Sequence, residues 1–308
     1  MKGQTVGHHE PLDREEPMSL MDSKVTLPTP LLEADWLASH LADPDLRILD
    51  ATAHVKVFPI PRIKSGRGDW RRAHIPGAVF ADLKKLSDPK KRSYTFTLPT
   101  AEHFSTAMAE IGIGVDSRVV IYDSRQNMWA ARLWWMLRYF GFDNAAVLNG
   151  GWNAWQQGGH PVCSKPCTYP SAQPFAPRAR QDLMVDKQGV LAAIDDPAVC
   201  IVSALGRRQH RGERNEYRRR GHIPGATNVT AWEILDRQSQ RYRSTDELQE
   251  RFGEILEADR VITYCGSGIA AASDALALHL LGHSKVAVYD GGLVEWNADR
   301  HLPLELGE

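Results

Sequence analysis

The pentapeptide His-Ile-Pro-Gly-Ala occurs twice in this 308-residue chain, at His74–Ala78 and at His222–Ala226. A landmark repeated at such a distance points to a duplicated unit, which has to be recognised before a fold can be assigned. Each half has one strand before the pentapeptide. After the pentapeptide come a second strand, a helical stretch and a third strand that leads into a Gly-Gly turn, in the same order in both halves. These are Arg47–Asp50, Val119–Asp123, Ala130–Tyr139 and Val147–Trp152 in the first half, and Cys200–Ser203, Val261–Cys265, Ala270–Leu281 and Val288–Gly292 in the second. The chain is therefore predicted to contain two copies of one domain.

The strands are short, apolar and rich in β-branched residues, and they alternate with helical patterns, which is typical of parallel βαβ units. We expect an α/β fold with two tandem domains, each a mainly parallel sheet flanked by helices. Five prolines between Pro161 and Pro177 indicate an extended connection between the copies. The predicted organisation is a poorly ordered polar tail over 1–27, a first domain over 28–160, a linker over 161–181 and a second domain over 182–308.

The charge balance excludes several classes of protein. Lys and Arg number 37 and Asp and Glu number 38, so a basic nucleic-acid binder is not expected. No run of about 18 apolar residues is present, and the first residues contain no apolar stretch, so we expect neither a membrane span nor a targeting peptide. Four cysteines are too few for a disulfide scaffold of this length, and we expect a cytoplasmic protein.

The two halves differ at the end of the strand that follows the pentapeptide. The first half has Asp123 there, and the second has Cys265, followed by Gly266, Ser267 and Gly268. In α/β sheets, ligands bind beyond the carboxyl ends of the strands. Small residues and a helix N-terminus at this place provide backbone N–H groups and partial positive charge, which favour the thiolate of Cys265. Cys265 is therefore predicted to be a nucleophile, since the thiolate is the reactive form.

The other cysteines carry less information. Cys200 lies within an apolar strand and is expected in the core, while Cys163 and Cys167 lie in the linker with no further ligands nearby. We expect no metal site. A phosphatase loop is disfavoured because no arginine occurs from Gly266 to Gly282, and no phosphate-binding glycine motif is present.

The doubled pentapeptide, the Asp-to-Cys difference and the Cys265–Ala270 loop together resemble the two-domain rhodanese superfamily, and within it the branch that uses 3-mercaptopyruvate. The resemblance extends from about residue 30 to residue 305. It implies an inactive first domain, an active second domain, a site between them, a persulfide on Cys265, and neither metal nor organic cofactor. The loop residues Gly266, Gly268, Ile269 and Ala270 would then bind the substrate.

The resemblance also implies a proton relay. Rhodaneses that use thiosulfate typically carry basic residues after the cysteine, whereas Gly266 and Ser267 are neutral. In the mercaptopyruvate branch, the hydroxyl two places after the cysteine works with the histidine of the first pentapeptide, which here gives Ser267 and His74. Such a pair could protonate the departing enolate. Asp69 is the candidate acid that would orient His74, although a purely structural turn histidine is the alternative.

One position departs from the family pattern. The family supplies an arginine to the substrate carboxylate where this chain has Gln209, although Arg207 and Arg208 are adjacent. The segment Arg207–Arg220 contains seven arginines and two glutamates, and it could be a solvated loop or a cationic rim that steers anionic donors.

These features predict a sulfurtransferase that moves sulfur from 3-mercaptopyruvate, through Cys265, to a thiol or cyanide. The expected partners are a small anionic donor and an acceptor that is a small thiol or a thioredoxin-like protein. The alternatives are a thiosulfate sulfurtransferase on the same fold and a carrier that holds a persulfide without turnover.

Overall fold

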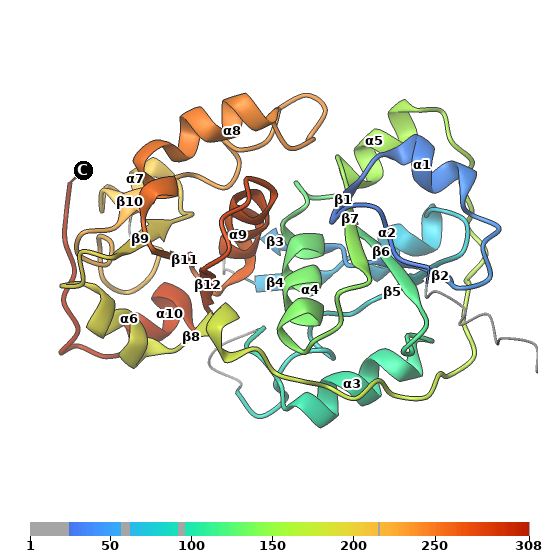
Figure 1. Cartoon of the computed structure of the whole chain (residues 1–308), viewed down its shortest axis with the longest axis horizontal. Helices are drawn as coiled ribbons and strands as arrows, with labels where there is room; N and C mark the ends of the chain where they lie inside the picture. The colour runs from blue at the N-terminus through green and yellow to red at the C-terminus, as the bar shows by residue number, and fades with distance from the viewer. Residues whose placement is uncertain (1–24, 57–61, 92–95, 215, 308) are drawn as a thin grey trace, which may run out of the picture.

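The computed structural model describes residues 25–56, 62–91, 96–214 and 216–307. It forms two lobes side by side, the N-terminal half in blue to green and the C-terminal half in yellow to red (Figure 1). Most of the tail predicted over 1–27 lies outside the described residues. The expected fold class, two α/β units with parallel sheets, is confirmed.

The N-terminal half is built on a five-stranded parallel sheet in the order β1-β7-β6-β2-β5. Its central strand β6 is buried at every position, as expected for a strand covered on both faces. A small antiparallel hairpin, β3–β4, is inserted after β2. The strands are β1 (Leu31–Leu32), β2 (Leu46–Asp50), β3 (Ala53–Lys56), β4 (Arg62–Ser65), β5 (Ala78–Phe80), β6 (Arg118–Tyr122) and β7 (Ala145–Leu148), and the helices are α1 (Ala34–Ser39), α2 (Arg67–Arg72), α3 (Ala101–Glu110), α4 (Met128–Tyr139) and α5 (Gly151–Gln157).

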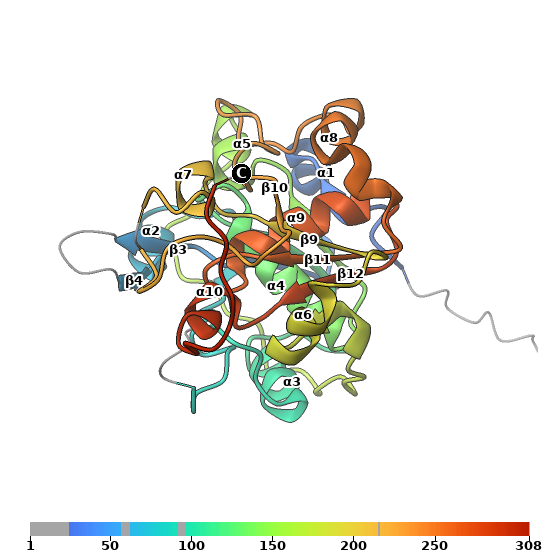
Figure 2. The ribbon, with the colours of Figure 1, turned by 90° about the vertical axis from the view of Figure 1, so that its left-hand side faces the viewer.

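The C-terminal half repeats this sheet in the order β10-β9-β11-β12-β8, again parallel throughout. Figure 2 shows this half in front, with α8 and α9 on one side of the sheet and α6 and α10 on the other. Its elements are β8 (Met184–Val185), β9 (Val199–Ser203), β10 (Thr227–Asn228), β11 (Arg260–Tyr264), β12 (Val286–Tyr289), α6 (Lys187–Ala193), α7 (Arg207–His210), α8 (Thr245–Phe252), α9 (Ile269–Leu280) and α10 (Gly292–Trp296), with 3-10 turns at Gln181–Leu183 and Gly253–Glu257. Strand for strand, the order of the first sheet recurs, which confirms the duplication.

The pentapeptide is a turn held against the central strand of each half. The backbone N–H of Ile75 donates to the Tyr122 hydroxyl at 3.3 Å, and that of Ile223 donates to the Tyr264 hydroxyl at 3.2 Å. Both isoleucines are fully buried. The repeated motif therefore fixes the end of the strand from which the following loop departs.

The two halves meet along α4 and α9, which lie together at the centre of both views (Figures 1 and 2). Arg132 on α4 is fully buried and forms an ion pair with Asp290, which follows β12. Arg132 Nη2 also donates to the Phe96 carbonyl at 2.7 Å, and the Leu98 N–H donates to Asp290 Oδ2 at 2.8 Å. The end of β12 is thereby fixed to the N-terminal half.

The proline-rich connection contains neither helix nor strand before Gln181, but it packs along the N-terminal half. His74 and Cys163 exchange two backbone hydrogen bonds, of 2.8 and 2.9 Å. The Tyr169 hydroxyl donates to the Gly77 carbonyl at 2.7 Å, and Phe175 is buried. The linker therefore braces the first pentapeptide turn.

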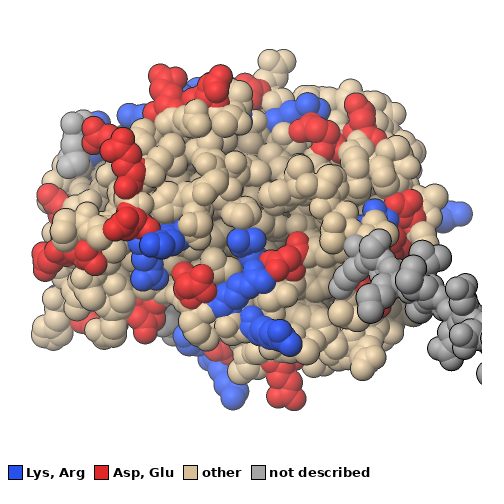
Figure 3. All heavy atoms as spheres, in the orientation of Figure 1, with Lys and Arg blue, Asp and Glu red and all other residues tan. Residues whose placement is uncertain are grey.

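Acidic and basic side chains are interleaved on the face shown in Figure 3, in keeping with the near-zero net charge. Among the described residues, no helix is long and apolar enough to cross a membrane.

Candidate active site

Cys265 directly follows the central strand β11, at the carboxyl end of the second sheet. It is 4% exposed, Gly266 and Gly268 are buried, and Ser267 and Ala270 are half-buried. Gly268 has φ 73° and is the residue before α9, which starts at Ile269. The first N–H groups of a helix have no partner within it, so those of α9 face the loop that begins at Cys265.

A Gly-Gly turn at the start of α10 packs against the loop that begins at Cys265. The Leu293 N–H donates to the Cys265 carbonyl at 2.9 Å, and the Val294 N–H donates to the Gly266 carbonyl at 3.0 Å. Gly292 has φ 54°, and a Cβ atom at this position would lie 2.6 Å from both carbonyl oxygens. Only glycine fits there, because both the conformation and the close approach exclude a side chain. With both carbonyls turned towards α10, the N–H groups of the loop are left for a ligand.

The far end of the loop lies against the N-terminal half. A Cβ atom on Gly268 would lie 3.1 Å from Arg132 Nη1. The buried Arg132–Asp290 ion pair is thus adjacent to the loop as well as to the domain boundary. Nothing in the local sequence pattern indicates this pair, apart from the second Gly-Gly turn, which Asp290 precedes.

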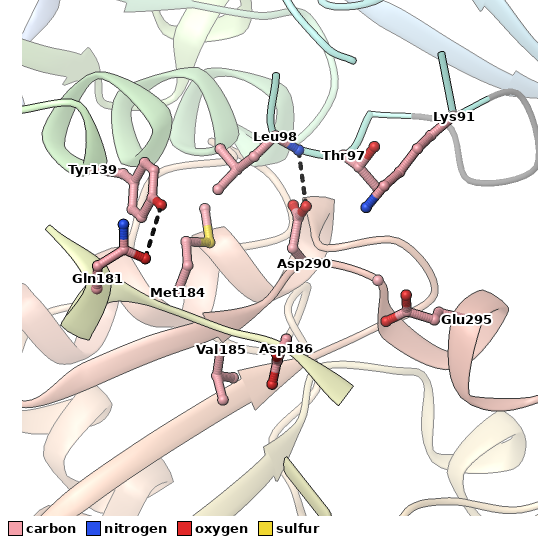
Figure 4. Close-up of a pocket in the computed structure, with 11 residues that line it drawn as sticks. Lys91, Thr97, Leu98, Tyr139, Gln181, Met184, Val185, Asp186, Asp290 and Glu295 are labelled. Carbon is pink, nitrogen blue, oxygen red and sulfur yellow. Dashed lines mark hydrogen bonds between the residues drawn. The ribbon is translucent and has the colours of Figure 1, made fainter. Parts of the chain in front are cut away.

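A cavity of about 370 Å³ opens between the two halves beside this turn (Figure 4). The N-terminal half contributes Lys91, Thr97, Leu98 and Tyr139, and the C-terminal part contributes Gln181, Met184, Val185, Asp186, Asp290, Gly291 and Glu295. The cavity reaches Gly291, but Cys265 is not among the residues that line it.

Tyr217 covers the loop on another side and was not predicted as a site residue. A Cβ atom on Gly266 would overlap its hydroxyl and lie 2.7 Å from its Cζ. Burial and the neighbouring Cys265 raise the pKa of the Tyr217 phenol well above its ordinary value. Its hydroxyl therefore stays protonated and can donate a hydrogen bond.

The structure corrects the prediction that Asp69 orients His74. The Asp69 carboxylate contacts His54 and Arg72 instead. The His74 ring is fully buried, its Nδ1 donates to the Trp70 carbonyl at 2.6 Å, and it stacks on the Trp70 ring at 4.8 Å between centroids. Asp69 lies in the first turn of α2 (Arg67–Arg72), and its side chain contacts the β3–β4 hairpin, which carries His54.

Among described residues, no hydrogen bond joins His74 to Ser267. The buried Nε2 of His74 has no partner within the described part of the chain. The Ser267–His74 relay therefore stays a prediction.

The two arginines at the start of α7 each form an ion pair. Arg207 pairs with Glu233 at 3.0 Å and Arg208 pairs with Glu213 at 3.0 Å. Gln209 Oε1 accepts from the Gly206 N–H at 3.2 Å, and its amide group donates to Glu216. The roles of Arg208 and Gln209 in substrate binding stay predictions.

Asp123 occupies in the first half the place that Cys265 has in the second. Its carboxylate accepts from the backbone N–H groups of Arg125 and Ala130, and its carbonyl accepts from Trp152 at 3.0 Å. Burial raises the pKa of Asp123 to about 6. The first half thus keeps the loop architecture but carries an acid in place of a nucleophile.

All four cysteines are free, and burial raises the pKa of Cys200. No cluster of three or more His, Cys, Asp or Glu suited to a metal ion occurs among the described residues.

Comparison with known proteins agrees with this geometry. The model of the rhodanese-like domain matches residues 33–158 and 205–299. The chain belongs to the rhodanese family. A 3-mercaptopyruvate sulfurtransferase of Escherichia coli K12 is 36% identical over 277 residues, covering 88% of this chain and 96% of the relative. The thiosulfate sulfurtransferase of Gallus gallus is 32% identical over 275 residues, covering 86% and 92%.

The crystal structure of SseA from Escherichia coli, described with the mechanism of 3-mercaptopyruvate sulfotransferases, superposes with a TM-score of 0.76 at 34% identity, covering 86% of this chain and 98% of SseA. An anaerobic ergothioneine biosynthesis enzyme from Chlorobium limicola shares the fold with a TM-score of 0.79, at 23% identity over 91% of this chain and 70% of its own. This rhodanese is thus a two-domain enzyme of the sulfurtransferase class.

Proposed function

We propose that this rhodanese transfers sulfur from 3-mercaptopyruvate, through a persulfide on Cys265, to a thiol or to cyanide. The observation that carries the proposal is the position of Cys265 at the end of the central strand, in a neutral loop whose carbonyls are turned away towards α10. The match to a relative named for this donor covers 96% of that relative's length, and this supports the same substrate.

The first half-reaction needs only the chain's own groups. The Cys265 thiolate attacks the sulfur of 3-mercaptopyruvate, an S–S bond forms, and the C–S bond breaks with its electron pair passing to carbon. Carbon is reduced and Cys265 is oxidised to the persulfide, so no external oxidant is needed. The resulting pyruvate enolate takes up one proton, which Ser267 would relay. The N–H groups of the loop and of α9 stabilise the negative charge on sulfur.

In the second half-reaction, a thiolate or cyanide attacks the outer sulfur of the persulfide and the Cys265 thiolate leaves. The products are a new persulfide or thiocyanate, and the enzyme returns to its starting state. The acceptor is proposed to be a small thiol or a thioredoxin-like protein. The same proposal places the enzyme in the cytoplasm, where its four free cysteines would stay reduced.

Thiosulfate is the second candidate donor, because a relative at 32% identity is named for it. The neutral Gly266 and Ser267 favour mercaptopyruvate, whereas the engaged Arg207 and Arg208 offer little charge to either anion. The third candidate function, besides transfer from either donor, is that of a carrier that holds a persulfide without turnover.

Steady-state assays with each donor and cyanide test the proposal. We expect a higher kcat/KM for 3-mercaptopyruvate, one added sulfur on the wild type by intact-protein mass spectrometry, and none on Cys265→Ser. Cys200→Ser is the matched control and should load normally. Sulfur on another cysteine, or a single loading without turnover, would contradict the enzyme. Gln209→Arg should lower KM for mercaptopyruvate by about tenfold, since a charge-assisted contact replaces a neutral one.

A further inference from the structure

A glycine is required at position 266 because of a neighbouring side chain and not because of its backbone conformation. Its φ is not positive, unlike those of Gly268 and Gly292, so an L side chain would fit its conformation. The space for that side chain is filled by Tyr217, whose Cζ and Cε1 would lie 2.7 and 2.9 Å from a Cβ atom. Residue 266 therefore has to be glycine, because the Tyr217 ring packs directly against it.

Tyr217 is fixed by the same helix that fixes the loop. Asn297, directly after α10, donates from Nδ2 to the Tyr217 carbonyl at 2.7 Å. The guanidinium of Arg219 donates to the carbonyls of Asp299 and Leu302 at 3.0 and 2.7 Å. The start of α10 meanwhile binds the carbonyls of the loop. The phenol and the nucleophile loop thus share one rigid support.

The chemistry of the phenol suits a sulfur anion. It is partly buried and close to Cys265, and both effects keep its proton in place. No hydrogen bond from its hydroxyl is made within the described part of the chain. The guanidinium groups of Arg207 and Arg208, which could compete for an anion, are paired with carboxylates.

We propose that Tyr217 is a catalytic residue of this rhodanese, with its hydroxyl donating a hydrogen bond to the sulfur carried by Cys265 while its ring closes the loop at Gly266. The inference rests on the persulfide mechanism proposed above. Tyr217 supplies a neutral donor close to Cys265, and its ring restricts position 266 of the loop to glycine.

The first test removes only the hydroxyl. Tyr217→Phe should lower kcat with mercaptopyruvate by about tenfold or more, since a hydrogen bond to a charged group is lost in the transition state, while KM and the melting temperature change little. Tyr242→Phe is the matched control, because its hydroxyl shares a 2.8 Å hydrogen bond with Ser273 on α9, away from the Cys265 loop and the inter-domain cavity, and it should keep the wild-type kcat. Treatment with the sulfur donor followed by intact-protein mass spectrometry distinguishes a failure of the persulfide mechanism from a failure of the role proposed for Tyr217. No sulfur on wild-type Cys265 would overturn the persulfide mechanism and this inference with it, whereas normal loading and an unchanged kcat in Tyr217→Phe would overturn this inference alone.

The second test uses the contact with Gly266. Gly266→Ala in the wild type should lower both the melting temperature and kcat, because its methyl group collides with the phenol. In a Tyr217→Ala background the same substitution should have little further effect on either quantity, since the space is then empty. Equal losses in the two backgrounds would show that Tyr217 is not seated on the loop and would overturn the proposal.

Discussion

His222 repeats, in the C-terminal half, the surroundings of His74 in the N-terminal half. The His222 ring stacks on His210 at 3.7 Å between centroids, and its Nδ1 donates to the His210 carbonyl at 2.9 Å. His74 makes the same two contacts with Trp70. The outer nitrogens differ, since His222 Nε2 lies 3.7 Å from Glu305 and His74 Nε2 is unpaired within the described residues. Both rings therefore stabilise their pentapeptide turns. Of the two, only His74 has an Nε2 atom without a partner among the described residues, and this atom is available for the proposed proton relay.

This equivalence gives a matched pair of variants. His74→Ala and His222→Ala should each lower the free energy of unfolding by about 1–3 kcal/mol, because each loses a buried hydrogen bond and a stacked ring. If the relay operates, His74→Ala alone should also slow turnover at a temperature where both variants are folded. The double variant with Ser267→Ala should then be little slower than the slower single variant. Equal kcat values for the two histidine variants would make His74 a turn residue only.

Gly292 and Gly282 form a second matched pair. Both have positive φ, but a Cβ atom on Gly282 would meet nothing within 4 Å, whereas one on Gly292 would meet the carbonyls of Cys265 and Gly266. Gly282→Ala should therefore cost about 1 kcal/mol of stability from its conformation alone and leave kcat unchanged. Gly292→Ala should cost more and abolish most sulfur transfer, because the nucleophile loop has to move. Chemical denaturation and steady-state rates measure the two effects, and similar behaviour of the pair would contradict the supporting role of the turn.

The buried Arg132–Asp290 pair is predicted to couple the two halves. Arg132→Leu should lower the free energy of unfolding by about 3–5 kcal/mol, since it leaves the Asp290 carboxylate without its partner. Asp290→Asn should be at least as costly, because it leaves the fully buried Arg132 guanidinium without a carboxylate, and the single amide oxygen cannot accept from both Arg132 and Leu98. A double variant that loses much less than the sum of the single variants would confirm direct coupling. Strictly additive losses would contradict it.

The features that sequence predicts here are those set by local pattern. The apolar strands follow from their composition, although β6 and β11 each end one residue before the predicted ends, Asp123 and Cys265. The position of Cys265 at the end of a strand follows from the apolar run that precedes it. Because the halves are duplicates, each prediction could be checked against its copy. Side-chain partners across the chain have no such pattern.

Three residues illustrate that limit. Asp69 is near His74 in sequence, yet the inserted hairpin provides His54 as its partner. Tyr217 reaches Gly266 from a loop without periodicity, whose path is fixed by Asn297, 80 residues later. Arg132 looks like a surface residue of an amphipathic helix until α9 and Asp290 cover it. Each depends on tertiary contacts that only the folded chain creates.

Asp123 predicts an unusual dependence of stability on pH. Burial raises its pKa from 3.8 to about 6, so the folded state binds this proton more tightly than the unfolded state. Its contribution is fully present below pH 4 and is lost as the pH rises through 6, which amounts to about 3 kcal/mol. In Asp123→Asn this titration is absent, so the stability of the variant relative to the wild type should rise by up to that amount between pH 4 and pH 7. Asp236 is the control of opposite sign, because hydrogen bonds from Ser239 lower its pKa. The relative stability of Asp236→Asn should fall as the pH rises to about 4 and stay flat through the range in which Asp123 titrates. Urea unfolding at a series of pH values measures both differences, and a flat difference for Asp123→Asn would show that the carboxyl is solvated rather than buried at the place of the missing nucleophile.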